Sequence, residues 1–326
     1  MKKHSFTMAE ILISLTIIGV IAAITLPSLR ANINEKAWAT QRKALYSRMT
    51  QALSMFPSLN GYGIGATQAE TDQNAAISFV TEGLNKVLQI SNICNKAKLK
   101  DCGIPDTIIT MPNMSTGRTS KIDFPKNLTE LNPMFTSTYI TGSGDSFSNP
   151  QSNINTDVAA FETKNGESIA VFYNPYCYSE TGATVENYTQ PYMCANFIYD
   201  LNGRKGPNKF GNDIGFISVL YPTDSEIVAP MPLIKNAQNG TENTIAQSDA
   251  AAACRVLDNN SRVPNINELQ AMFYNEQFLG ISYGNFWSNS ISTERNNFAW
   301  RLFFKTGTKG ITVRTATTYY VRCVKK

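Results

Sequence analysis

The sequence predicts an α+β protein in which a long N-terminal helix leads into an antiparallel β head and then into a second α+β module. Apolar residues from Met8 to Leu26 nearly supply the stretch of about 20 that a helix needs to cross a bilayer. The apolar residues that follow, up to Phe56, recur mostly at three, four and seven, as in an amphipathic helix. The rest of the chain is low in charge (17%) and rich in polar turn residues, which is typical of short strands.

The apolar run is predicted to form a membrane-spanning half of the helix at about residues 8–27, and the amphipathic residues after it a second half. The basic residues ahead of it (Lys2, Lys3 and His4) indicate an N-terminus on the cytoplasmic side. A secretory signal peptide would have a shorter apolar core, a small-x-small cleavage site and no carboxylate such as Glu10. The sequence therefore favours a retained helix over a cleaved signal peptide.

The segment Ser5-Phe6-Thr7-Met8-Ala9-Glu10 and the apolar run after it resemble the class III leader of type IV pilins and type II secretion pseudopilins. The resemblance implies a leader at residues 1–5, which a prepilin peptidase removes by cutting between Ser5 and Phe6, and N-methylation of Phe6. It also implies that Glu10 pairs with the terminal amine of a neighbouring subunit, because a buried carboxylate needs a partner. The family usually has Gly where this chain has Ser5, which predicts slower processing.

The chain is long enough for two domains after the helix. We expect the N-terminal pilin helix at 6–59, a pilin-like β-rich head at 60–235 and a last module at 236–326. Prolines between 222 and 232, with a polar stretch after them, mark the boundary between the head and the module.

The six cysteines favour disulfides, since the residues after the apolar run are expected outside the cytoplasm. The sequence by itself leaves the pairing open. Proximity suggests Cys94 with Cys102 and Cys177 with Cys194, which leaves Cys254 for Cys323. No zinc site is expected, because none of the spacings is Cys-x-x-Cys.

Histidine usage argues against catalysis. The only histidine, His4, lies in the predicted leader, so the mature chain would have no Ser-His-Asp or Cys-His pair and no His-ligated metal. Asp and Glu are scattered, with no recognisable pair for glycosidase chemistry. The sequence therefore predicts a protein that is not an enzyme and that requires no cofactor.

A polar loop that begins at Asp200 and ends at Asp213 lies between two predicted strands and is similar to a loop in many minor-pilin-like and pseudopilin-like heads. Oxygen atoms of Asp200, Asn202, Asn208 and Asp213 could hold calcium, which takes about six to eight such ligands. The loop is not an EF-hand, because Arg204 occupies a would-be ligand position. An Asn-Gly turn with Asx hydrogen bonds explains the same residues, so both alternatives stay open.

The last module carries a second resemblance. Its motifs are similar, in order, to those of C-type-lectin-like modules in bacterial surface proteins: Ala251-Ala252-Ala253-Cys254, Ser261-Arg262-Val263-Pro264-Asn265, Phe286-Trp287-Ser288 and Tyr320-Val321-Arg322-Cys323. The resemblance supports a disulfide between Cys254 and Cys323. It also suggests a ligand surface near Trp287 and Arg301, although core packing is an alternative role for Trp287 and the sugar-binding triplets of calcium lectins are absent.

Together these features predict a minor pilin or pilin-like subunit that assembles into a type IV pilus or related filament through its N-terminal helix and displays a distal adhesin module. The alternative is a type II secretion pseudopilin with a structural or tip-capping role. The expected location is the inner membrane, as a single-pass protein, and then a periplasmic or extracellular filament. Expected partners are other pilin subunits, the assembly machinery, prepilin peptidase, the inner membrane and a glycan or other surface ligand. A net charge of +4 makes nucleic acid an improbable partner.

Overall fold

The computed structural model of the chain describes residues 8–60, 73–113, 116–135, 138–140, 146–148, 155–175, 192–221, 226–228, 233–236, 244–257, 259–281, 284–293, 295–305, 307–316 and 319–325. It divides into two compact units, Met1–Ala44 and Leu45–Lys326, and each is described by itself.

Helix α1 (Met8–Asn60) contributes to both units. In the second unit, the helix buries one set of side chains: Leu45, Met49, Ala52, Leu53 and Phe56. Their spacing of mostly three and four residues places them on one side of the helix, while the residues between them are half-buried or exposed. This part of α1 therefore has one apolar face that packs into the unit.

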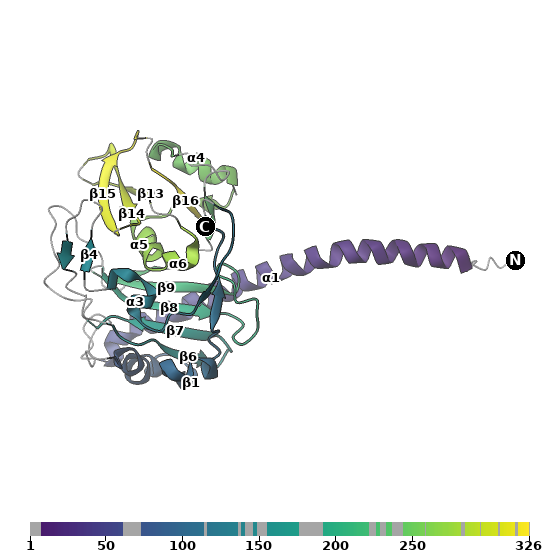
Figure 1. Ribbon diagram of the computed structural model, residues 1–326, viewed down its shortest axis with the longest axis horizontal. Coiled ribbons are helices and arrows are strands. Elements are labelled where there is room, and N and C mark those ends of the chain that lie inside the picture. Colours follow the sequence, from purple (N-terminus) through teal and green to yellow (C-terminus); the bar gives the residue numbers. More distant parts are fainter. Residues whose placement is uncertain are drawn as a thin grey trace. The chain divides into compact units, whose positions relative to one another are not determined.

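The centre of the second unit is a six-stranded antiparallel sheet with the order β1-β6-β7-β8-β9-β10 (Figure 1). The strands are β1 (Ile90–Cys94), β6 (Ala159–Thr163), β7 (Ser168–Tyr173), β8 (Tyr192–Asp200), β9 (Ile214–Tyr221) and β10 (Glu226–Val228). All residues of β7 are buried, so both faces of the sheet are covered there.

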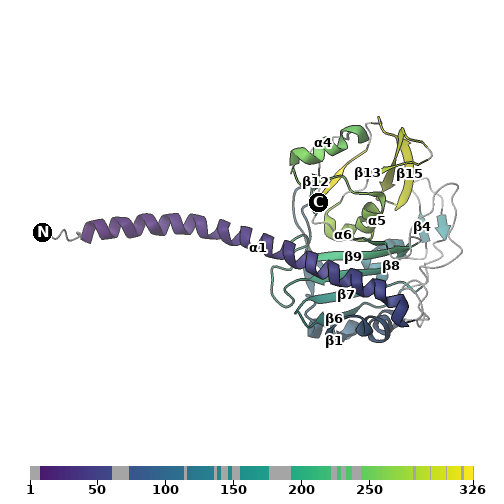
Figure 2. The same ribbon diagram turned by 180° about the vertical axis from the view of Figure 1, so that it is seen from behind.

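One face of the sheet is covered by the last part of α1, by α2 (Ala75–Ser78) and by the helical turns η2 (Phe79–Gly83) and η3 (Leu84–Lys86) (Figure 2). The ring of Phe79 stacks on Tyr173 of β7, with 4.3 Å between centroids, and lies 5.4 Å from the ring of Phe56 in α1. Arg48 of α1 forms an ion pair with Glu167, next to β7. These contacts attach the end of α1 to the sheet.

The other face packs against α5 (Ile266–Tyr274) and α6 (Glu276–Leu279). Both helices lie between the sheet and a three-stranded sheet of β13 (Asn285–Ile291), β14 (Phe298–Phe303) and β15 (Thr308–Val313) (Figure 1). One buried cluster joins residues of the central sheet, including Phe172 and Phe216, with Phe273 and Phe278 of the helices. This core takes residues from both sides of the boundary predicted between 235 and 236, and that boundary stays a prediction.

The start of α5 follows from local sequence. Asn265 caps the helix by accepting a hydrogen bond from the backbone N–H of Glu268 (2.8 Å), and Glu268 accepts one from the backbone N–H of Asn265 (2.7 Å). Arg262 donates to both oxygens of the Glu268 carboxylate, at 2.7 and 2.6 Å. Hydrogen bonding to Glu268 raises the pKa of Arg262, which favours its charged form.

Shorter elements complete the unit. The strands pair as β2 with β3, β4 with β5, and β11-β16-β12. The bounds are β2 (Thr107–Ile109), β3 (Lys121–Asp123), β4 (Thr138–Ile140), β5 (Ser146–Ser148), β11 (Leu233–Asn236), β12 (Ser261–Arg262), β16 (Arg322–Lys325), α3 (Leu128–Leu131), α4 (Gln247–Leu257), η4 (Lys96–Cys102) and η5 (Pro133–Phe135).

The α+β class with antiparallel sheets is confirmed, but the membrane-spanning half predicted at about 8–27 is wrong. Among the described residues, no helix has both the length and the apolar character that crossing a membrane requires. The prediction gave the aliphatic side chains of this stretch more weight than the polar groups among them, which are Glu10, Ser14, Thr16 and Thr25. A single-pass inner-membrane location, which was inferred from that span, is therefore unsupported.

The predicted long helix mounted on a pilin head is corrected as well. The division between the two units falls within α1, after Ala44, so only its last part belongs to the body that contains the sheets. The physical reason is that side-chain spacing indicates a helix but does not decide which of its residues pack against the rest of the chain.

Gly103 offers a test of the packing between η4 and β7. It has a φ of +77°, and an added Cβ would overlap Ser168 Oγ. We expect Gly103→Ala to lower the free energy of unfolding by about 1–3 kcal/mol more than Gly117→Ala does. Gly117 is the matched control, because it has a φ of +66° with nothing within 4 Å of an added Cβ. Urea unfolding of both variants measures the difference, and equal losses would contradict the close packing at Ser168.

Candidate functional site

The structure describes only part of the predicted processing and assembly region. Ser5 and Phe6 lie outside the described residues. Glu10 lies in α1, but its side chain is outside the description. Their predicted roles in cleavage, methylation and assembly therefore stay predictions.

The described aliphatic side chains at the start of α1 are exposed. Their exposed fractions lie between 54% and 62% for Leu12, Ile13, Leu15, Ile17, Ile18, Val20 and Ile21. At about 100° of rotation per residue, these positions point to all sides of the helix. The hydroxyl of Thr16 donates to the carbonyl of Leu12 at 2.7 Å, so it is satisfied within the helix. Every side chain from Leu12 to Ile21 is therefore exposed, on all sides of the helix.

The disulfides are confirmed for two of the three predicted pairs, Cys94–Cys102 and Cys254–Cys323. Cys194 is also disulfide-bonded, and Cys177, its predicted partner, lies outside the described residues. The Cys254–Cys323 bond joins α4 to β16, which lie far apart in the sequence.

The Asp200–Asp213 loop connects β8, which ends at Asp200, with β9, which begins at Ile214, and these two residues are paired in the sheet. The fully buried carboxylate of Asp213 organises the loop. It accepts hydrogen bonds from the backbone N–H groups of Asn208 (2.9 Å) and Lys209 (2.8 Å) and from the side-chain amide of Asn202 (3.3 Å). The four predicted cation ligands thus belong to one connected structure.

Three oxygen atoms of this loop are buried without a hydrogen-bond partner: Asp200 Oδ2, Asn202 Oδ1 and Asn208 Oδ1. The other carboxylate oxygen of Asp200 accepts from the backbone N–H of Asn202 at 3.1 Å, which is an Asx turn. The predicted Asn-Gly turn is therefore present, but it leaves these three oxygen atoms unused. Each buried polar atom without a partner costs about 1–3 kcal/mol.

The electrostatics of the loop are set by Asp200, which is 2% exposed. Burial raises the pKa of its carboxyl from 3.8 to about 8; the backbone N–H of Asn202 lowers this pKa, and the charge of Asp213 raises it. The charge of Asp213 favours a proton on Asp200 or a cation near both carboxyl groups.

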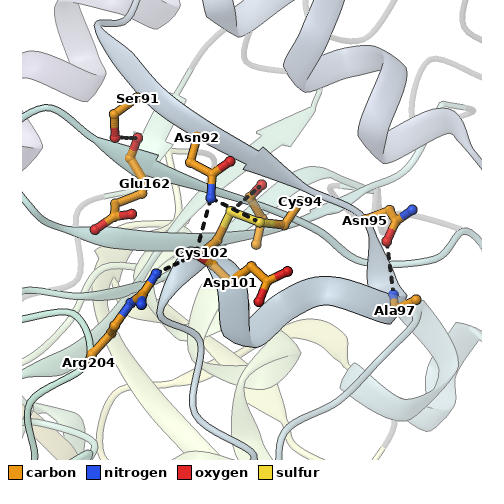
Figure 3. Close-up of a disulfide and its surroundings, with 10 residues drawn as sticks. Ser91, Asn92, Cys94, Asn95, Ala97, Asp101, Cys102, Glu162 and Arg204 are labelled. Carbon is orange, nitrogen blue, oxygen red and sulfur yellow. Dashed lines mark hydrogen bonds between the residues drawn. A yellow bond between two sulfur atoms is a disulfide. The ribbon is translucent and has the colours of Figure 1, made fainter.

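Arg204, which the sequence placed at a would-be ligand position, is engaged elsewhere. Its guanidinium donates to the carbonyl of Asp101 at 2.7 Å, beside the Cys94–Cys102 disulfide (Figure 3). The side-chain amide of Asn92 donates to the same carbonyl at 3.1 Å (Figure 3). Arg204 therefore ties the loop to the disulfide-closed segment and is exposed at the surface.

Trp287 and Arg301, the predicted ligand surface, are both used within the fold. Trp287 is fully buried, and its indole N–H donates to the carbonyl of Ile245 at 2.8 Å. Arg301 donates to the side chains of Asn285 and Thr312 and lies over the ring of Tyr319. Core packing, the alternative role that the sequence allowed for Trp287, is the role it has.

A buried pair of amides was missed by sequence reasoning. Asn196 of β8 and Asn275, which joins α5 to α6, exchange hydrogen bonds of 2.9 and 3.0 Å, and Ser218 of β9 donates to Asn196 at 2.6 Å. All three residues are buried. No local pattern announces this pair, because its members are 79 residues apart.

Sequence reasoning also missed a pocket of about 480 Å³ with a mixed polar and apolar lining. Its wall includes Asn74, Asn95 and Lys126, and the ammonium of Lys96, which lies 2.7 Å from the carboxylate of Asp157. Its described lining contains no Ser, Thr, Cys or His, the usual nucleophiles and bases.

Within the described ranges, no group of three or more His, Cys, Asp or Glu side chains is placed to hold a metal ion. The Asp200–Asp213 loop is of another kind, because two of its four candidate ligands are amide oxygens of Asn202 and Asn208. Such a set suits a hard cation that prefers oxygen. The loop is therefore the best-formed candidate site in the described part of the chain.

The raised pKa of Asp200 predicts how stability depends on pH in buffer with a chelator. The pKa of Asp200 is near 4 in the unfolded chain and about 8 in the folded chain. Between these two pH values, only the folded chain keeps the proton on this carboxyl group. The free energy of unfolding therefore falls as pH rises, by at most about 1.4 kcal/mol per pH unit for this group. We expect Asp200→Asn to make this fall shallower, because an amide does not ionise. Part of the fall remains, because burial also raises the pKa of Glu276, to about 7. Urea unfolding from about pH 5 to about pH 9 measures it.

The control for this measurement is Asp123→Asn, which removes an exposed carboxylate of β3. It should keep the pH dependence of the wild type. A fall in stability that is as steep in Asp200→Asn as in the wild type would show that another group is responsible.

Comparison with known proteins finds no matching family model and no matching curated protein.

Proposed function

We propose that the chain is a pilin-like subunit that assembles into a filament through the first part of α1. The observation that carries this proposal is the exposure of aliphatic side chains on all sides of the helix between Leu12 and Ile21. Exposed apolar surface is stabilised when it is buried, and contiguous exposed apolar patches mark interaction surfaces. Identical helices from other copies of the chain are well suited to cover it.

A filament is the assembly that such a contact favours. A contact between different surfaces of identical subunits extends without limit when its rotation does not close a ring. The exposed apolar residues point to all sides of the helix, so more than one side can contact neighbouring copies. In this proposal Glu10 pairs with the terminal amine at Phe6 of a neighbour, which offsets the cost of burying its carboxylate.

Of the two roles considered for such a subunit, a structural or tip-capping role has more support than adhesion. The adhesin role relied on Trp287 and Arg301 as a ligand surface, and both are engaged within the fold. The segment that contains them shares a core with the central sheet. In this proposal, the C-terminal part serves to build the body of the subunit.

Ile18→Lys tests assembly. A lysine in the contact between helices would have to be buried, which is costly for a charge, so we expect at least about tenfold less chain in sheared filaments. Lys36→Glu is the matched control, since it changes an exposed charge of the same helix, and it should assemble normally. Glu10→Gln should also reduce assembly. Normal assembly of Ile18→Lys would refute the proposal.

Binding measurements with the full chain distinguish the two roles. We use the full chain because the C-terminal part shares its core with the sheet. The structural role predicts that any retention on sulfated glycans or duplex DNA disappears as salt is raised, because it would reflect unspecific charge. Saturable binding to one glycan that persists at high salt would instead establish an adhesin.

A further inference from the structure

The starting observation is that three oxygen atoms of one loop are buried without a partner: Asp200 Oδ2, Asn202 Oδ1 and Asn208 Oδ1. Buried polar atoms in folded proteins nearly always have a hydrogen-bond partner. Asp200 itself is 2% exposed. Three such atoms within the short connection of β8 to β9 indicate that something else satisfies them.

The neighbouring hydrogen bonds hold these side chains in place. The side-chain N–H₂ of Asn202 donates to the carbonyl of Gly206 (3.1 Å) and to Asp213 Oδ2 (3.3 Å), which fixes the direction of its oxygen atom. The backbone of Asn208 is fixed through its N–H on Asp213 and its carbonyl, which accepts from Ile109 of β2 at 2.9 Å. The side chain of Asn202 and the backbone of Asn208 are thus held in place.

We propose that this loop binds one calcium ion. Asp200 supplies a carboxylate oxygen, Asn202 and Asn208 supply amide oxygens, and the carboxylate of Asp213 adds a second negative charge. These are hard oxygen ligands, which calcium accepts in flexible geometries, with water to complete its shell. Magnesium requires a near-ideal octahedron and retains most of its water, and zinc prefers nitrogen and sulfur.

The position of Arg204 agrees with this assignment. Its guanidinium donates a hydrogen bond to the carbonyl of Asp101 (Figure 3). The positive charge of Arg204 is therefore held at the segment that the Cys94–Cys102 disulfide closes. The loop is also bonded to β2, since Phe210 N–H donates to the carbonyl of Ile109 at 2.9 Å. An ion bound here would stabilise the contacts of the β8–β9 connection with β2 and with η4.

The test uses the full chain, stripped of metal with a chelator and kept in a non-ionic detergent because of its apolar helix. Calorimetry with calcium chloride should give one ion per chain, and calcium should raise the melting temperature, because the ion binds only the folded chain. Asp200→Asn should weaken calcium binding at least about tenfold, since affinity depends on the number of charged ligands.

Asn208→Gly is the second variant, designed to spare the fold. Asn208 has a φ of 54°, which glycine adopts without strain, and the lost oxygen atom makes no hydrogen bond. It should keep the melting temperature of the calcium-free chain and lose most of the calcium-dependent rise. Asp123→Asn, which removes an exposed carboxylate outside the loop, should bind calcium like the wild type.

Several results would overturn the assignment. No heat and no change in melting temperature at millimolar calcium would mean that water satisfies the three oxygen atoms. Equal affinity in Asp200→Asn or Asn208→Gly would place any bound calcium elsewhere. Magnesium binding as tight as calcium binding would contradict the choice of ion.

Discussion

The packing of α5 and α6 against the six-stranded sheet is the constraint on which the rest of the second unit depends. The ring of Phe278 stacks on Phe210, with centroids 5.0 Å apart, and the Asn196–Asn275 amide pair lies in the same interface. The apolar rings provide most of the stabilisation, since they leave water completely. The amides make the packing specific, because their hydrogen bonds form only when the helices are correctly aligned on the sheet.

This interface also positions the β8–β9 connection. Phe210 belongs to the loop and packs against both α6 and β9, so the loop is held from the side of the core as well as by Asp213. Further links hold α4 and the start of α5. The Cys254–Cys323 disulfide joins α4 to β16, and Arg262 orients the start of α5 through Glu268.

The Asp200–Asp213 loop and the first part of α1 differ in what they bury and what they expose to solvent. The loop buries oxygen atoms that no protein group satisfies, whereas the start of α1 exposes aliphatic side chains. Both are unfavourable in an isolated chain. Each is relieved by something from outside the chain: a cation for the loop, and other copies of the helix for α1.

The sequence by itself determined the features that depend on near neighbours. It indicated the apolar face of α1 between Leu45 and Phe56, the disulfide Cys94–Cys102 and the composition of the Asp200–Asp213 loop, because these depend on residues that are near one another in the chain. Only the tertiary structure decided which groups are buried together. It placed Trp287 in the core and packed α5 and α6 against the sheet. It also divided α1 after Ala44 and left three oxygen atoms of the loop without a hydrogen-bond donor. These outcomes depend on contacts between residues far apart in the chain, which no local pattern encodes.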